Sequence, residues 1–504
     1  MNSAASNRHS TVLNVALALC LAMGLPALAE SREDELQSLR QEVQELRRRD
    51  ALREAQLERL LERIDELESP PQSGGAAPEA SAAPVPAPAP APPAPAGDLW
   101  SRTVGPASLR LLDIGLGVLA AAGSSSEKGQ PLEDLQAGEH DPRQRGFTLR
   151  QAELSLQGAV DPFLRGDAFL IYFLDPEGES RFELEEAYAT SLSLPFGLQD
   201  RGLQLRAGTF FTRFGRQNAQ HPHQWHWLDQ PVVLSRIFGG DGLRGPGFDL
   251  AWLTPLPWFS ELRVGVQNSR GETQVSFLAN DEVFAKRAIG GRPLVKNDVE
   301  GAEDLAFLVR WANGFDLGDS WSSEIGASGA FGPNATGEDA RSWIYGADAV
   351  AKWRPQPTDR GWPFVILQGE ILRRDYEADA FSGTIDVGGM PVAVVLPHDT
   401  LHDWGLYAQA LWGFRRGWAA GLRYEYADGS GDSFAAGSAV SHNRDPFRAR
   451  RQRVSPLLLV DPSEFARVRL QYNYDHAENL LDGDAHSVWV GLEISLGAHA
   501  AHVY

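Results

Sequence analysis

The sequence predicts an all-β fold, a transmembrane antiparallel β-barrel of about 16 strands, preceded by an α-helical coiled coil. Two observations predict the barrel. Apolar and polar residues alternate through most of residues 98–504, and longer connections alternate with short ones. A third observation, a heptad repeat near the start of the chain, predicts the coiled coil.

The first 29 residues have the pattern of a secretory signal peptide. An apolar run covers residues 12–25, and Ala27-Leu28-Ala29 provides the small residues that a signal peptidase requires. We therefore assign residues 1–29 to a signal that is cleaved after Ala29. Lipidation at Cys20 is the alternative, but Leu19 is larger than the residue that usually precedes a lipidated cysteine. Cleavage after Ala29 also removes the single cysteine.

Residues 30–69 carry apolar side chains at spacings of three and four, which favours a left-handed coiled coil. Asp50 and Arg53 fall on the same frame and would fix the register at some cost in stability. A single amphipathic helix packed elsewhere is the alternative. Residues 70–97 are dominated by Pro and Ala and are expected to form an extended linker. The apolar seam consists of Leu36, Leu39, Val43, Leu46, Leu57, Leu60, Ile64 and Leu67.

Residues 98–504 are assigned to the barrel. In residues 466–474, for example, Val468, Leu470 and Tyr472 alternate with Arg467 and Arg469, and a period of two places these sets on opposite faces of a strand. Sixteen such strands are predicted, at 107–119, 147–159, 163–174, 182–194, 202–214, 247–254, 260–268, 303–313, 321–331, 343–354, 362–373, 403–414, 417–427, 450–461, 464–476 and 485–497.

The connections between these strands are predicted to alternate strictly between short and long. The short turns include 161–162, 255–257, 415–417 and 461–462, and the longest loops are 120–146, 215–246, 269–302 and 374–402. Outer-membrane barrels have this asymmetry, with tight periplasmic turns and longer external loops. An even strand number places both barrel ends, and with them the coiled coil, in the periplasm. A soluble sandwich or propeller is the alternative, but its outward faces would be polar.

The segment Leu149-Arg150-Gln151-Ala152-Glu153-Leu154, leading through Asp161-Pro162 to the paired strands, resembles the phosphate-selective porin O and P family. The resemblance covers residues 107–504 as architecture. It implies an outer-membrane homotrimer in which the third external loop narrows each barrel, and passive passage of anions or small hydrophilic solutes. The family's anion-selective pores are lined by many lysines and arginines. This chain has only four lysines, so the sequence does not assign phosphate selectivity.

Strand parity nominates the residues that line the lumen. The basic candidates are Arg165, Arg206, Arg310, Arg423, Arg467 and Arg469. The acidic candidates are Glu153, Asp167, Glu425 and Glu493. Rings of arginine favour anions, but the carboxylates on the same face leave the preference open.

The predicted third loop, residues 215–246, contains the candidates for a pore constriction: Arg216, His221, His223, Trp225, His226 and Asp229. His221, His223 and His226 are also candidate ligands for zinc or copper, because neutral imidazole suits these ions and the nearby carboxylate can complete the set. Three alternatives stay open: packing of the loop against the barrel wall, direct contact with solute, and a response to pH.

Several function classes are not expected. The formal net charge of -21 makes nucleic acid an unsuitable partner. The chain has neither a Gly-x-Ser-x-Gly nor a His-Glu-x-x-His motif, so we predict no enzyme and no cofactor. The expected partners are outer-membrane lipid and small solutes. Two further roles stay open: metal binding or uptake through the histidine-rich loop, and tethering of the membrane to the cell wall through the coiled coil.

Overall fold

The computed structural model describes residues 101–104, 107–110, 112–355 and 358–497. The chain divides into two units, Met1–Pro93 and Ala94–Tyr504. The predicted signal peptide, coiled coil and linker, residues 1–97, lie outside the described residues. All the described residues lie in the second unit.

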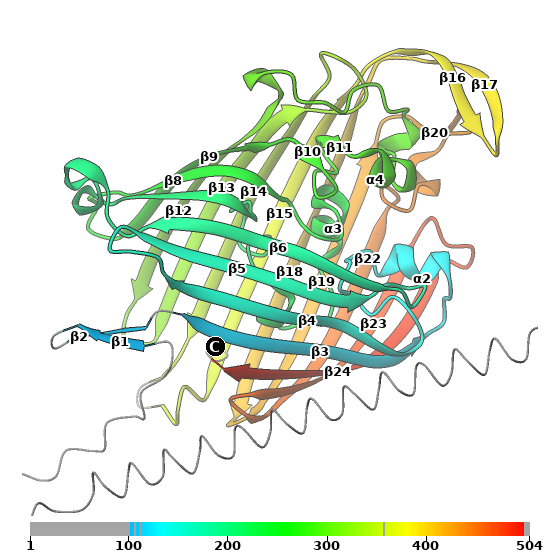
Figure 1. The fold of residues 1–504 in the computed structure, drawn as a ribbon. Coiled ribbons are helices and arrows are strands. Elements are labelled where there is room, and N and C mark those ends of the chain that lie inside the picture. Colours follow the sequence, from blue (N-terminus) through cyan, green and yellow to red (C-terminus); the bar gives the residue numbers. More distant parts are fainter. Residues whose placement is uncertain (1–100, 105–106, 111, 356–357, 498–504) are drawn as a thin grey trace, which may run out of the picture. The chain divides into compact units, whose positions relative to one another are not determined.

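Sixteen antiparallel strands form a closed barrel (Figure 1), which confirms the predicted barrel and its strand number. Pairing of the last strand with the first closes the ring, with Leu492 opposite Ala120. The barrel strands are β3 (Asp113–Ser125), β4 (Gly146–Ala159), β5 (Leu164–Leu174), β6 (Ser180–Ser191), β7 (Leu203–Phe211), β8 (Arg244–Leu253), β9 (Phe259–Asn268), β12 (Leu305–Leu317), β13 (Trp321–Pro333), β14 (Arg341–Trp353), β15 (Phe364–Ala378), β18 (Asp399–Arg415), β19 (Trp418–Ser430), β22 (Arg451–Ser463), β23 (Ala466–Ala477) and β24 (Asp484–Gly497).

The barrel wall is polar on its inner face and apolar on its outer face, which is the reverse of a water-soluble protein. In β23, Arg467, Arg469 and Gln471 are buried inside, whereas Leu470 and Tyr472 are exposed on the outside. The same inversion recurs in β24, where Glu493 is buried and Leu492 is exposed. Membrane barrels have this arrangement because lipid contacts the outer face and polar groups fill the interior. The exposed apolar band therefore fits a lipid environment.

The prediction of the first strand at 107–119 was wrong. Ala107–Arg110 forms β2, which pairs with β1 (Ser101–Val104) in a separate hairpin, and the barrel begins at Asp113. The parity of the sequence explains the break. The outward apolar residues Ile114 and Leu116 occupy even positions, whereas Leu109 is odd, and one continuous strand would turn these residues to opposite faces.

The connections depart from strict alternation. At the end of the barrel that carries the long loops, the connections 175–179, 334–340 and 478–483 are short. At the opposite end, the connections 192–202 and 354–363 are longer than these three. The overall asymmetry remains, but it comes from a subset of the loops.

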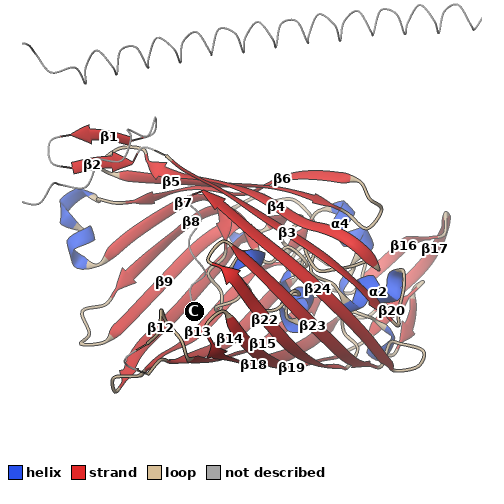
Figure 2. Cartoon of the chain, turned by 90° about the horizontal axis from the view of Figure 1, so that it is seen from below, coloured by secondary structure: helices blue, strands red, loops and turns tan. Residues whose placement is uncertain are grey.

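The long loops at one end of the barrel carry short elements of their own, several of which can be followed in Figure 2. These are α2 (Gln130–Leu135), α3 (Val232–Phe238), β10 (Arg270–Gly271), β11 (Leu278–Ala279), α4 (Asp281–Lys286), the β16 (Phe381–Val387) and β17 (Met390–Leu396) hairpin, and the β20 (Ser433–Ala435) and β21 (Ser438–Val440) hairpin. Six 3₁₀ turns complete the described part: Pro195–Gly197, Gln199–Arg201, Pro222–Gln224, Ile289–Gly291, Ala302–Asp304 and His442–Arg444. Among the described helices, none is long and apolar enough to cross a membrane.

The inverted faces make a testable prediction. Replacing Leu470, which lies outside near the middle of β23, by arginine should reduce the free energy of unfolding in lipid by about 2–4 kcal/mol, because the charge would contact hydrocarbon. Leu481→Arg, in the fully exposed connection 478–483, is the matched control and should change stability little. Equal effects of the two substitutions in denaturant titrations from vesicles would contradict the membrane orientation.

Candidate functional site in the barrel lumen

The connection between β7 and β8, residues 212–243, folds into the barrel and is here called the β7–β8 loop. It corresponds to the predicted third loop, and its α3 lies within the ring of strands in Figure 1. Connecting segments normally run over the surface. This one is almost entirely buried, and its α3 contacts β15, β18 and β19. The loop therefore fills much of the interior.

Asp229 holds the loop against the inner wall. Its carboxylate is fully buried and accepts hydrogen bonds from Arg423, from Arg453 at 2.9 Å, and from the amides of Gln471 and Asn473 at 2.8 and 2.9 Å. These donors come from β19, β22 and β23. Burial alone would raise the pKa of Asp229, but Arg423 and Arg453 outweigh it and hold that pKa well below its ordinary value. Asp229 is therefore an ionised anchor.

Neighbouring groups of the loop add hydrogen bonds to the same side of the wall. The indole nitrogen of Trp227 donates to the carbonyl of Ser455 at 2.9 Å, and the backbone nitrogen of Val232 donates to Glu425 at 2.6 Å. Buried polar groups are costly unless they are hydrogen-bonded. The match between loop and wall therefore fixes this half of the loop in one position.

An apolar cluster holds the other side of the loop. Phe214, Val233, Leu234, Ile237 and Phe238 pack against inward-facing residues of the wall. Those wall residues include Leu308, Ile344, Leu372 and Tyr407. Apolar positions thus occur on both faces of β12, β14, β15 and β18, because these strands contact the loop inside and lipid outside.

The arginines nominated by parity lie inside the barrel beside carboxylates. Arg206 contacts Asp249 at 2.6 Å and Arg310 contacts Asp348 at 2.6 Å. The remaining pairs are Arg423 with Glu425 and Asp229, Arg467 with Asp461, Arg469 with Glu493, and the half-exposed Arg165 with Asp167. Most of these guanidinium groups are therefore neutralised and buried, which limits their contact with a passing solute.

The loop candidates fall into different surroundings. Arg216 is partly exposed and lies 3.5 Å from Glu324. Trp225 is buried, and its indole nitrogen donates to the carbonyl of Gln220 at 3.0 Å. His226 packs beside Trp227, and burial together with nearby arginines lowers its pKa to about 3, so its ring is neutral at physiological pH.

The three histidines of the loop do not converge. His221 and His223 stack with their ring centroids 5.5 Å apart, beside Glu153 of β4 and Glu185 and Glu186 of β6. Among the described residues, the group whose atoms could hold a metal ion is Glu153, Glu185 and His221, and it does not contain His226. The carboxylates come from strands distant in sequence, so spacing within the loop could not reveal them.

Sequence reasoning missed Arg213. Predicted strand 202–214 placed it opposite in parity to Arg206 and therefore toward lipid. Instead β7 ends at Phe211, and Arg213 belongs to the loop, exposed but close enough to Arg206, Arg263 and Asp249 for their charges to act on it. Within the described residues Arg213 forms no ion pair. Its guanidinium group is thus an exposed positive charge inside the barrel.

A cavity of about 780 Å³ lies between the loop and the wall, near the turns 254–258 and 318–320. Arg216 and Lys352 line it together with Glu324 and Asp316. These charged groups share the lining with apolar side chains such as Trp258 and Phe259. The position of the cavity inside the barrel wall provides space that water and small polar solutes can enter.

No family model matches the chain. An uncharacterised protein of Aquifex aeolicus is 30% identical over 343 residues, which cover 66% of this chain and 64% of that protein. The chain thus spans less than two thirds of the length of that relative. The resemblance to the phosphate-selective porin O and P family stays a prediction.

Several solved barrels resemble this one. The outer membrane channel DcaP of Acinetobacter baumannii matches with a TM-score of 0.45 and 12% identity, over 76% of this chain and 97% of that chain. An anion-selective porin of Comamonas acidovorans matches with a TM-score of 0.43 and 8% identity, over 76% of this chain and 99% of that chain.

Removing the Asp229 carboxylate should release the loop. In Asp229→Ala, Arg423 and Arg453 lose a buried counter-ion, which should weaken docking of the loop by about 3 kcal/mol. Trypsin should then cleave within residues 212–243 of the purified barrel. The exposed turn variant Asp200→Ala should resist cleavage as the native protein does. Undiminished protease resistance of Asp229→Ala would show that the apolar cluster alone holds the loop.

Proposed function

We propose that this protein is an outer-membrane channel through which small hydrophilic solutes diffuse passively. The observation that carries the proposal is the inverted barrel, apolar outside and polar inside, with a cavity lined in part by charged groups beside a loop that narrows it. A polar interior that is not completely filled provides a route for water and solutes. The apolar band and the polarised loop lengths support the outer membrane as its location.

The β7–β8 loop would set the size of the route. Its docked half, around Asp229, blocks the side of the lumen formed by β19, β22 and β23. Its first part carries Arg213 and Gln224, which are exposed, and Arg216, which lines the cavity. Solutes would therefore pass the first part of the loop and not the anchored part.

We infer a mild preference for anions. Arg206 and Arg263 share the carboxylate of Asp249, and Arg263 also contacts Glu261. Arg213 beside them adds a positive charge that lies on open space. In the cavity, Arg216 and Lys352 are balanced by Glu324 and Asp316. One surplus guanidinium supports a weak preference and does not provide the ring of cations that strong phosphate selection requires.

Electrophysiology tests this proposal directly. The purified native protein in a planar bilayer should conduct, with a reversal potential in a KCl gradient on the anion side. Arg213→Glu should lower the anion-to-cation permeability ratio by about fivefold, as expected from roughly 1 kcal/mol of charge interaction in water. Arg201→Glu, on an exposed turn, should leave the ratio unchanged. A non-conducting barrel would refute the channel, and an unchanged ratio in Arg213→Glu would place the route elsewhere.

We also propose that the channel is a homotrimer, as the resemblance to the phosphate-selective porin O and P family implies. The heptad seam of residues 30–69 predicts self-association and would help to join the chains. Wall contact through the same segment stays a second prediction, and both concern residues outside the described part.

Cross-linking in detergent tests the trimer. The full chain should yield a three-chain species, and a chain lacking residues 30–69 should yield less of it. A monomer at all concentrations would contradict the trimer without bearing on conductance.

A further inference from the structure

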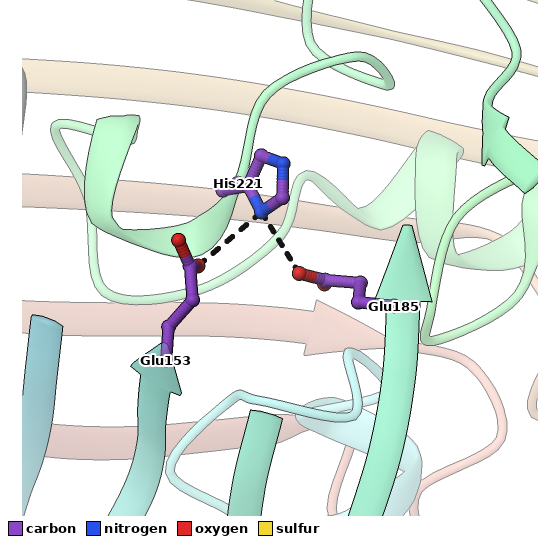
Figure 3. A group of neighbouring side chains, drawn as sticks. All are labelled: Glu153, Glu185 and His221. Atoms are coloured by element: carbon purple, nitrogen blue, oxygen red, sulfur yellow. Dashed lines mark ion pairs between the residues drawn. The ribbon is translucent and has the colours of Figure 1, made fainter. Parts of the chain in front are cut away.

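A buried cluster in the lumen differs from the other ionic contacts there. His221 of the β7–β8 loop lies between carboxylates of β4 and β6, as Figure 3 shows. Its Nδ1 lies 2.8 Å from Glu185 Oε2 and 3.3 Å from Glu153 Oε2, while its Nε2 lies 2.8 Å from Glu186 Oε2. His221 and the three carboxylates are all buried.

The charges of this cluster are unbalanced. Buried carboxylates elsewhere in the lumen, such as Asp229, Asp249 and Asp403, are each paired with two arginines. Among the described residues, neither an arginine nor a lysine forms an ion pair with Glu153, Glu185 or Glu186. Burying three carboxylates beside imidazoles is costly without a further positive charge. The cluster therefore requires additional positive charge, which either a proton on His221 or a bound cation can supply.

The geometry at His221 favours a metal ion as that cation. Glu185 Oε2 and His221 Nδ1 are both buried and lie 2.8 Å apart, and within the described residues neither has a hydrogen-bond partner outside this cluster. Two acceptor atoms that face one another at this distance are suited to coordinate the same ion. Ligand atoms around a tetrahedral zinc ion lie about 3.3 Å apart, given metal–ligand distances near 2.0–2.1 Å. The potential ligand atoms of Glu153, Glu185 and His221 all lie within 4.8 Å of one another.

Glu186 supplies the outer-shell contact that metal-binding histidines usually have. A carboxylate that accepts the proton of one ring nitrogen fixes the tautomer and points the lone pair of the other nitrogen at the metal. Glu186 Oε2 occupies this position at His221 Nε2. Similarly, Gln151 donates to Glu153 Oε2 at 2.9 Å, and His223 Nδ1 lies 3.2 Å from the same oxygen.

We propose that Glu153, Glu185 and His221 bind a divalent transition-metal ion of the zinc class, with Glu186 as a positioning residue. One imidazole and two carboxylates suit such an ion better than Ca²⁺ or Mg²⁺, which prefer oxygen ligands throughout. This set replaces the three histidines that the sequence suggested, since His226 lies outside it. The bound ion would join the first part of the β7–β8 loop to β4 and β6, whereas Asp229 joins the loop to β19, β22 and β23.

Metal analysis of the full-length protein tests the site. After chelation and dialysis against Zn²⁺, the native chain should retain one ion per chain, and Co²⁺ in its place should give a visible absorption band that excess Mg²⁺ does not remove. His221→Ala and the nearly isosteric Glu185→Gln should both lose the ion and the band. His226→Ala, in the same loop, should retain both.

Glu186 should show a graded effect. Glu186→Ala should weaken Zn²⁺ binding by about 10–100-fold, whereas Glu186→Gln, which keeps an acceptor oxygen for the ring proton, should restore most of it. A correctly folded Glu185→Gln barrel that still holds one ion, or a native chain that holds none, would overturn the proposal. These measurements do not involve conductance, so they test the metal site independently of the proposed channel function.

Discussion

The lumen is organised around a single buried carboxylate. Asp229 receives hydrogen bonds from two arginines and two amides, and these four donors project inward from three neighbouring strands. Each donor would be costly to bury without an acceptor, and the carboxylate would be costly to bury without them. The carboxylate of the loop and the donors of the wall thus compensate the cost of burying one another. Without these hydrogen bonds the interior would contain uncompensated charge, and this part of the loop would have no fixed position from which to narrow a channel.

The barrel wall contacts hydrocarbon on its outer face, and the polar lumen and the β7–β8 loop on its inner face. Its outer face presents residues such as Leu470 and Leu492 to hydrocarbon, whereas its inner face presents paired arginines and carboxylates. On β14 and β15 the inner face also carries apolar residues, Ile344 and Leu372, which pack in one cluster with residues of the β7–β8 loop. Polarity on the inside therefore varies with what each strand touches. The open part of the lumen is where charged groups such as Arg213 and Arg216 stay at least partly exposed to water.

Most of the wall could be predicted from the sequence, because a period of two records directly which face contacts lipid. All sixteen barrel strands were predicted, and the first was misplaced because the parity change between Leu109 and Ile114 was overlooked. The interior of the loop was less accessible to prediction. Arg213 was assigned to a strand that ends two residues earlier, and the carboxylates beside His221 are contributed by strands about 35 to 70 positions away in the sequence. Local patterns contain no information about such pairings.

The anchoring contacts also constrain the order in which the molecule can be assembled. Asp229 and Arg453 are separated by 224 positions, and Trp227 and Ser455 by 228. Contacts at such separations form late, since the intervening chain must first be ordered. The β7–β8 loop therefore has no complete docking surface until β19, β22 and β23 have joined the wall. During biogenesis the growing barrel would hold this segment undocked, and the interior would acquire its final shape only as the C-terminal strands close the ring.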